Sequence, residues 1–300
     1  MVENRKVMLA GVPALVRPPQ DDIDGAPLIV LWHGYGPPAS EQALAELLPL
    51  DEVAAWKLYP ALPLFGERLP EGGMDEIMRR QLSDYVLDLL LPTVEAAVAE
   101  LPEMIAEAEH QLGVDASQGV GLFGFSAGAA AAILALLNEP LNRSVNIRAA
   151  VLAGAPPNLD IAVASFERGT QSYLDYLREH YDWFRDEMMT YRWSAASKAA
   201  RSQFDLGGRV DELTNHGLPP AVLLMHGEQD EMYSVVETQA LGNTLHAAYR
   251  KYSVAERTKV KTFPHLAHHL VLSEPNKVER QDLLAFQEAV ATWFRQYLLL

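Results

Sequence analysis

Short apolar runs alternate with longer amphipathic stretches along most of the chain. The runs are rich in Val, Ile and Leu and predict buried strands at 28–32, 57–59, 120–123, 149–154, 221–227 and 260–263. The amphipathic or alanine-rich stretches predict helices over 41–48, 76–91, 92–112, 129–137, 235–249 and 279–298. This alternation is typical of a mostly parallel sheet flanked by helices. We therefore predict an α/β fold.

An apolar segment at 7–16 lies near the N-terminus, in the position of a secretory signal. Gly11 and Pro13 interrupt it, Glu3 precedes it, and no small-residue cleavage site follows it. A β-hairpin that opens the sheet explains the segment better. No apolar run reaches the roughly 18 residues that a membrane-spanning helix needs, so we expect no membrane partner.

Segment 156–218 separates two predicted strands and is too long to be a plain connector. It is dense in aromatic residues, and several large apolar side chains recur in it at helical spacing: Tyr173, Leu177, Tyr181, Phe184, Met188 and Tyr191. Much of the segment should therefore be amphipathic helix.

A candidate nucleophile lies in the sequence Gly124-Phe125-Ser126-Ala127-Gly128, directly after a predicted strand and before a predicted helix. A Gly-x-Ser-x-Gly sequence in this context is a nucleophile elbow, a tight turn that exposes the serine hydroxyl. The N-terminus of the helix offers unpaired N–H groups and a positive dipole end to a developing oxyanion. The alternative is a glycine-rich turn without chemistry.

A serine nucleophile needs a base that takes its proton and an acid that orients the base. Asp230 lies in the loop after the strand 221–227, and His265, His268 and His269 lie in the loop after 260–263. The chain order of serine, acid and histidine is the order of α/β-hydrolases.

The chain resembles the α/β-hydrolase family over most of its length, which implies that family's fold. His33-Gly34-Tyr35-Gly36 is similar to the family's H-G-x-G segment, and 226–230 is similar to its H-G-x-x-D acid loop. The resemblance implies that the backbone N–H groups of Tyr35 and Ala127 form an oxyanion hole.

The same resemblance assigns the triad of Ser126, Asp230 and His268. Family members commonly have a small residue before the catalytic histidine. Ala267 precedes His268, so His269 is the second choice and His265 the third. The histidines of the two family segments, His33 and His226, are expected to be structural, and the acids beside Asp230, Glu228 and Glu231, to be solvated.

An insertion at 156–218 resembles the lid of α/β-hydrolases. We therefore expect a core domain of residues 1–155 and 219–300 and a helical cap of residues 156–218, whose aromatic side chains either contact substrate or hold the cap to the core. The Pro- and Gly-rich loop at 60–75 either lines the site or is a plain connector.

Composition excludes several other functions. The chain has no cysteine, so disulfides, thiolate zinc sites and a cysteine nucleophile are excluded, and a cytoplasmic location is expected. Its formal charge of −16 argues against a nucleic-acid partner. The three clustered histidines lack a second group of ligands at a matching spacing, so we expect no metal and no cofactor.

These features together favour a serine hydrolase that cleaves a carboxylic ester of a small, largely apolar molecule through an acyl-enzyme. The same residues could cleave an amide, peptide or thioester bond, or transfer the acyl group to another alcohol. A ligand-binding protein with a vestigial triad is the alternative from another class. The sequence determines neither the natural substrate nor the oligomeric state.

Overall fold

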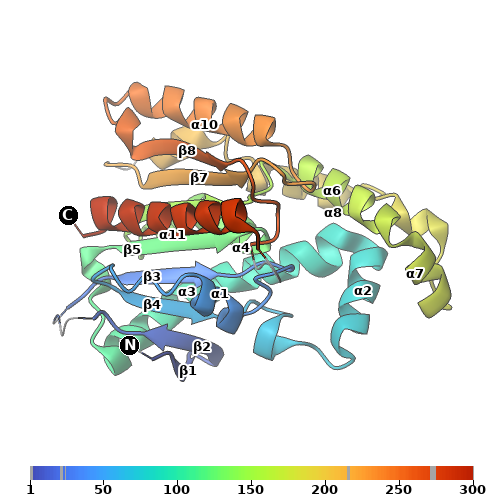
Figure 1. Ribbon diagram of the computed structural model, residues 1–300, viewed down its shortest axis with the longest axis horizontal. Helices are drawn as coiled ribbons and strands as arrows, with labels where there is room; N and C mark the ends of the chain where they lie inside the picture. The colour runs from blue at the N-terminus through green and yellow to red at the C-terminus, as the bar shows by residue number, and fades with distance from the viewer. Residues whose placement is uncertain (1–2, 21–22, 24, 215–216, 271–274, 300) are drawn as a thin grey trace.

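A twisted sheet forms the centre of the computed structural model, which describes residues 3–20, 23, 25–214, 217–270 and 275–299 (Figure 1). Within this part of the chain the sheet has eight strands in the order β1-β2-β4-β3-β5-β6-β7-β8. The strands are β1 (Arg5–Leu9), β2 (Val12–Arg17), β3 (Leu28–Trp32), β4 (Trp56–Pro60), β5 (Val120–Phe125), β6 (Ile147–Ala153), β7 (Ala221–Gly227) and β8 (Thr258–Phe263). β1 and β2 form the predicted hairpin, β2 pairs antiparallel with β4, and all later pairs are parallel. The predicted α/β fold is confirmed.

Helices cover both faces of the sheet, so the central strands are buried on both sides. In β3, Leu28, Val30 and Trp32 belong to one hydrophobic core, while Ile29 and Leu31 belong to the other. The first core is closed by α2 (Gly73–Asp84), α3 (Leu91–Leu112), α4 (Ala127–Leu136) and α10 (Val235–Arg250), and the second by α1 (Glu41–Leu47) and α11 (Lys277–Tyr297). Short helices occupy connections: η1 (Gly66–Arg68), η3 (Ala116–Gln118), α5 (Glu139–Asn142) and η6 (Ala255–Arg257). None of the helices in the described residues is long and apolar enough to cross a membrane.

The helix predicted over 76–91 is divided in the structure. α2 ends at Asp84, a π-helical segment η2 (Tyr85–Leu90) follows, and α3 then begins at Leu91. Asp84 has an extended backbone, with φ −151° and ψ 96°, and its carboxylate accepts a hydrogen bond from the backbone N–H of Leu87. The side chain of Asp84 therefore caps the new segment and interrupts a stretch that periodicity alone shows as continuous.

The segment between β6 and β7 is built from short helices that extend, together with α2, beyond the carboxyl ends of the strands (Figure 1). They are α6 (Leu159–Ser172), α7 (Leu174–His180), η4 (Asp186–Met189), α8 (Ala195–Ala200), η5 (Arg201–Phe204) and α9 (Val210–Thr214). Much of the segment is helical, as predicted, but the helical spacing from Tyr173 to Tyr191 does not correspond to one helix, because α7 ends at His180 and Tyr181 is extended.

Contacts with α2 explain why the aromatic side chains of 181–191 leave the helical pattern. The hydroxyl of Tyr181 donates to Asp75 at 2.9 Å, and that of Tyr191 donates to Asp84 at 2.6 Å. The guanidinium of Arg79 lies 4.6 Å from the ring centroid of Trp183. Tertiary contacts of this kind override a local helical preference.

The turn from β5 into α4 depends on close backbone packing. Ser126 joins the strand directly to the helix with φ 53° and ψ −113°. A Cβ atom on Gly124 would lie 2.2 Å from the carbonyl oxygen of Gly128, and one on Gly128 would lie 2.4 Å from the carbonyl oxygen of Trp32. The two glycines therefore let α4 pack directly against β5 and the end of β3.

A buried histidine fixes the loop that follows β3. The ring of His33 has no exposed surface; its Nδ1–H donates to the carbonyl of Gly34 at 2.8 Å, and its Nε2 accepts from the N–H of Leu62 at 3.1 Å. Only the neutral ring makes both bonds. Burial accordingly lowers the pKa of His33 to about 4. The adjoining N–H of Gly34 donates to the carbonyl of Pro38, which closes the loop carrying Tyr35.

Replacing Gly124 by alanine should lower the free energy of unfolding by about 3 kcal/mol or more, because rigid backbone atoms occupy the position of the new methyl group. Gly169 provides a matched control: it lies within α6, and a Cβ added to it would meet no other heavy atom within 4 Å. Gly169→Ala should raise the same free energy by up to about 1 kcal/mol. Urea unfolding of both variants measures the difference, and equal effects would contradict the packing argument.

The lowered pKa of His33 predicts a defined pH dependence of stability. The unfolded chain binds a proton near pH 6.5 and the folded chain only near pH 4, so the contribution is complete above about pH 6.5 and is lost progressively as the pH falls to about 4. The loss attributable to this ring is about 3 kcal/mol. His33→Gln should therefore give a flatter curve of unfolding free energy against pH than the native chain, measured by urea titrations. If the two proteins gave parallel curves, His33 would not be the source of this pH dependence.

Candidate active site

Three side chains from separate segments of the chain meet at the carboxyl edge of the sheet. The hydroxyl of Ser126, at the end of β5, donates to His268 Nε2 at 3.0 Å. His268, in the loop after β8, donates from Nδ1 to Asp230 Oδ2 at 2.8 Å, and Asp230 lies in the loop after β7. The structure thus brings together the serine, histidine and aspartate that the sequence singles out, in one continuous chain of hydrogen bonds.

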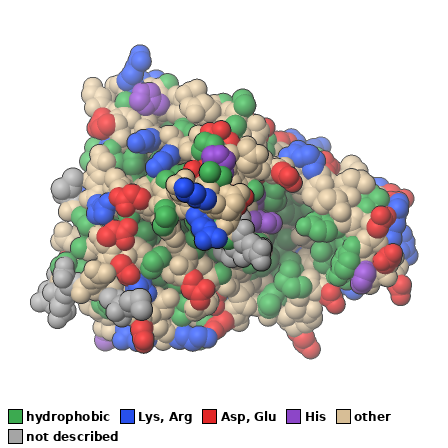
Figure 2. All heavy atoms as spheres, viewed as in Figure 1, with side chains coloured by type: hydrophobic (Ala, Val, Ile, Leu, Met, Phe, Trp, Pro, Cys, Tyr) green, Lys and Arg blue, Asp and Glu red, His purple; other side chains and the backbone are tan. Residues whose placement is uncertain are grey.

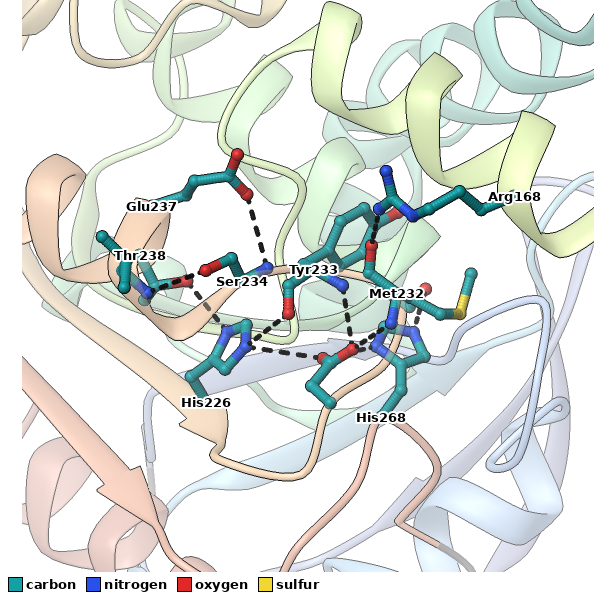
Figure 3. A network of polar contacts seen from close by, with 11 residues as sticks. Arg168, His226, Met232, Tyr233, Ser234, Glu237, Thr238 and His268 are labelled. Carbon is teal, nitrogen blue, oxygen red and sulfur yellow. Dashed lines mark hydrogen bonds and ion pairs between the residues drawn. The ribbon is translucent and has the colours of Figure 1, made fainter.

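Asp230 is held as a buried carboxylate by three donors, Met232, Tyr233 and His268, which are labelled in Figure 3. Its side chain is 1% exposed. Its Oδ1 accepts from the backbone N–H groups of Met232 and Tyr233 at 2.7 and 2.9 Å, while Oδ2 accepts from His268. Burial alone would raise the pKa of Asp230, but the hydrogen bond and charge of His268 and the N–H of Tyr233 together lower it below its ordinary value. The carboxylate is therefore ionised and oriented toward the histidine.

A second histidine, His226, supports the acid loop through the carbonyl of Tyr233 (Figure 3). Its Nε2–H donates to the carbonyl of Tyr233 at 3.2 Å, and its Nδ1 accepts from the hydroxyl of Thr238 at 2.9 Å. Burial lowers its pKa, although the nearby charge of Asp230 opposes this effect. A neutral ring with both nitrogens engaged in this way fixes the turn that presents Asp230.

The other two histidines of the loop after β8 point elsewhere. His269 lines the same cavity as Ser126, but its ring packs against Gly36, where an added Cβ would lie 2.5 Å from Nε2. His265 is exposed and its Nδ1 lies 3.1 Å from Asp282 Oδ2. Among the described residues, no group of three or more His, Asp or Glu side chains is arranged to hold a metal ion.

Both predicted oxyanion donors border the cavity at Ser126. Tyr35 and Ala127 line it, and the structure gives neither backbone N–H a hydrogen-bond partner among the described residues. Loop 60–75 contributes no lining residue within the described chain. Its Phe65 instead stacks on the ring of Tyr35, with centroids 4.3 Å apart, and so supports Tyr35 from outside the cavity.

The cavity itself has a volume of about 370 Å³ and lies between the strand ends and α6. Figure 2 shows a hollow bordered by hydrophobic side chains between the sheet and the projecting helices. Its walls include Tyr85 and Leu90 from η2, Pro156, and Met232 and Tyr233 from the acid loop. Sequence reasoning missed Tyr85 and Leu90 because they reach the cavity only through the π-helical segment. A π-helical turn is frequent at functional sites, but its position is visible only in the structure.

Comparisons with known proteins agree with this architecture. Residues 29–281 match the model of the Alpha/beta hydrolase family. No curated protein has a sequence that matches the chain. Among solved structures, TT1662 from Thermus thermophilus is 16% identical with a TM-score of 0.62 and covers 98% of each chain. An acylaminoacyl peptidase from Pyrococcus horikoshii is 14% identical with a TM-score of 0.61; the alignment covers 98% of this chain but only 41% of the peptidase.

A third similar structure is the esterase Pf2001 from Pyrococcus furiosus, which is 12% identical with a TM-score of 0.54 over 99% of this chain and 93% of the esterase. At these identities the solved structures establish the fold alone. The family match spans most of the chain, and the sheet order, with a serine between β5 and α4, agrees with it. The chain therefore belongs to the alpha/beta hydrolase family.

Proposed function

We propose that the protein is a serine hydrolase that cleaves a carboxylic ester of a small molecule. The observation that carries the proposal is the unbroken hydrogen-bond chain from Ser126 through His268 to Asp230, beside a cavity large enough for a small substrate. The hydrogen-bond roles assigned to the three groups suit nucleophilic catalysis: a hydroxyl that donates, a ring nitrogen that accepts, and an ionised acid behind it.

The first half of the reaction forms an acyl-enzyme. Ser126 Oγ attacks the ester carbonyl carbon while His268 Nε2 takes the hydroxyl proton, and the carbonyl oxygen becomes an oxyanion. The free N–H groups of Tyr35 and Ala127 point to stabilisation of this oxyanion, helped by the N-terminus of α4. The carbon–oxygen bond to the alcohol then breaks, and His268 returns the proton to the departing alcohol.

Water completes the reaction by the same steps. His268 takes a proton from water, the resulting hydroxide attacks the acyl carbon, and Ser126 leaves with the proton from His268. Asp230 stays ionised throughout and stabilises the imidazolium, in keeping with its lowered pKa. The reaction needs no cofactor.

We further propose that residues 156–218 act as a cap over this site. Its helix α6 contributes Ser165, Arg168 and Ser172 to the cavity, and Tyr173 follows at the end of the helix. A wall from the cap restricts access of water and substrate, which favours small substrates over extended polymers.

Removing the nucleophile tests the proposal directly. Ser126→Ala should lower kcat for small aryl esters by at least about 10⁴-fold. Mass spectrometry after treatment with a fluorophosphonate should show one covalent adduct on the native chain and none on the folded variant. Labelling or ester cleavage that persists in Ser126→Ala would overturn the assignment. Amides and thioesters of the same acyl group, assayed in parallel, determine which bond is preferred.

The two adjacent histidines provide a matched pair of variants. His268→Gln should lower kcat by at least about 10³-fold, since no base then takes the proton of Ser126. His269→Gln should change kcat less than about tenfold, because the ring of His269 contacts Gly36 and makes no bond to Ser126 or Asp230. Initial rates with a saturating ester measure both, and the reverse ranking would make His269 the base.

A further inference from the structure

One cationic side chain faces the cavity beside the candidate nucleophile. Arg168 is the one Lys or Arg among the cavity-lining residues that the structure describes. It extends from α6 toward the acid loop, and its Nη2 donates to the carbonyl of Met232 at 2.8 Å (Figure 3). This bond holds the guanidinium beside the turn whose backbone N–H groups anchor Asp230.

The guanidinium keeps spare hydrogen-bonding capacity. Within the described residues, Arg168 forms no ion pair, and its bond to Met232 uses only one of its five N–H donors. Two other arginines of the cap are paired, since Arg178 donates to Asp186 at 2.5 Å and Arg201 lies 2.6 Å from Asp160, whereas Arg185 donates only to the backbone carbonyls of Asp182 and Phe184. What distinguishes Arg168 is its position at the cavity, where its remaining donors are available to a ligand.

A buried hydroxyl adds an independent observation. Ser165 is 3% exposed, lines the same cavity, and its Oγ has no hydrogen-bond partner among the described residues. Ser165 and Arg168 are three residues apart on α6, so they lie on one face of the helix. A ligand that pairs this hydroxyl recovers a hydrogen bond that the described residues do not supply.

One carboxylate also lines the cavity, and its charge would favour a cationic ligand. Glu231 lines the rim and is exposed to solvent. The hydroxyls around the cavity donate or accept and so suit either kind of ligand. Arg168 is held by the carbonyl of Met232 and shares a helix face with the unpartnered Ser165 hydroxyl, whereas no hydrogen bond among the described residues holds Glu231. This arrangement favours an anionic ligand.

We propose that the substrate carries a carboxylate, held by Arg168 and Ser165 of α6 while its ester bond lies at Ser126. The inference rests on the proposed ester hydrolysis and adds the chemical class of the substrate: a half-ester of a dicarboxylic acid, or an ester whose alcohol part bears a carboxylate. It refines the expectation of a largely apolar substrate, since the aromatic walls would contact the carbon chain between the two groups.

Two matched pairs of esters test the proposal on either side of the scissile bond. para-Nitrophenyl hydrogen adipate is compared with the para-nitrophenyl ester of adipamic acid, and meta-carboxyphenyl acetate with meta-carbamoylphenyl acetate. In at least one pair, the native enzyme should prefer the carboxylate by about tenfold in kcat/KM, a value kept low because Arg168 is exposed to solvent. Arg168→Gln should lower kcat/KM for the carboxylate about tenfold more than for the neutral amide, and so remove this preference.

The variants separate recognition from support of the acid loop. If Arg168 only positions Met232, its loss lowers kcat/KM equally for both members of a pair, and that result overturns the proposal. The proposal is also overturned if the native enzyme shows, in each of the two pairs, the same kcat/KM for the carboxylate and the amide. A preference for cationic esters that Glu231→Gln abolishes overturns it as well. Ser165→Ala should weaken the carboxylate preference, whereas Arg178→Gln, an equal charge change on the cap outside the cavity, should not.

A binding measurement keeps this inference distinct from ester hydrolysis itself. If the native protein cleaves none of the esters, the proposed function fails. Calorimetric titration of Ser126→Ala with adipate and with adipamide then decides the inference alone. Tighter binding of adipate that is lost on adding Arg168→Gln supports it, and equal binding of the two compounds overturns it.

Discussion

The geometry of the candidate active site depends on the backbone contact between β5, α4 and the end of β3. Only glycine fits at 124 and 128, because any side chain there would overlap carbonyl groups of the facing backbone. This contact lets the chain pass from strand to helix through Ser126 alone, in a conformation with positive φ. It also places the first N–H groups of α4 next to the loop that carries Tyr35. The candidate nucleophile and the proposed oxyanion donors thus depend on one packing constraint, and a methyl group at either glycine would separate them.

A parallel sheet extends this constraint to the rest of the site. The loops after β5, β7 and β8 leave the same edge, so residues far apart in sequence converge there. Convergence alone does not orient a carboxylate. Asp230 is oriented by its own loop, where two backbone N–H groups fix Oδ1 and leave Oδ2 for His268. His226 holds that loop through the carbonyl of Tyr233. The residues that support Asp230 therefore lie close to it in the sequence, just as the two glycines of the elbow lie close to Ser126.

This locality explains what the sequence could and could not predict. Strands with continuous apolar runs and the elbow between two glycines carry their own short-range signals, and so their positions followed from the sequence. The break of α2 at Asp84, which caps Leu87, and the end of α7 at His180 occur where residues distant in sequence meet: Tyr191 contacts Asp84, and Tyr181 contacts Asp75. Hydrophobic periodicity carries no information about such contacts. The difference between His268 and His269 is of the same kind. Adjacent residues point in different directions, and only the fold determines which one faces Asp230.

The charge of the molecule places a physical limit on how a carboxylate substrate could be recognised. A formal charge of −16 repels anions at long range, so the field of the whole protein does not speed their association. At physiological ionic strength this repulsion fades over roughly 8 Å, whereas a hydrogen-bonded guanidinium acts at contact. Arg168 would therefore act mainly by slowing dissociation of a bound anion, and not by attracting it from solution. Selectivity of this kind would reside in two side chains of α6, Arg168 and Ser165, so it could change without disturbing the elbow or the sheet.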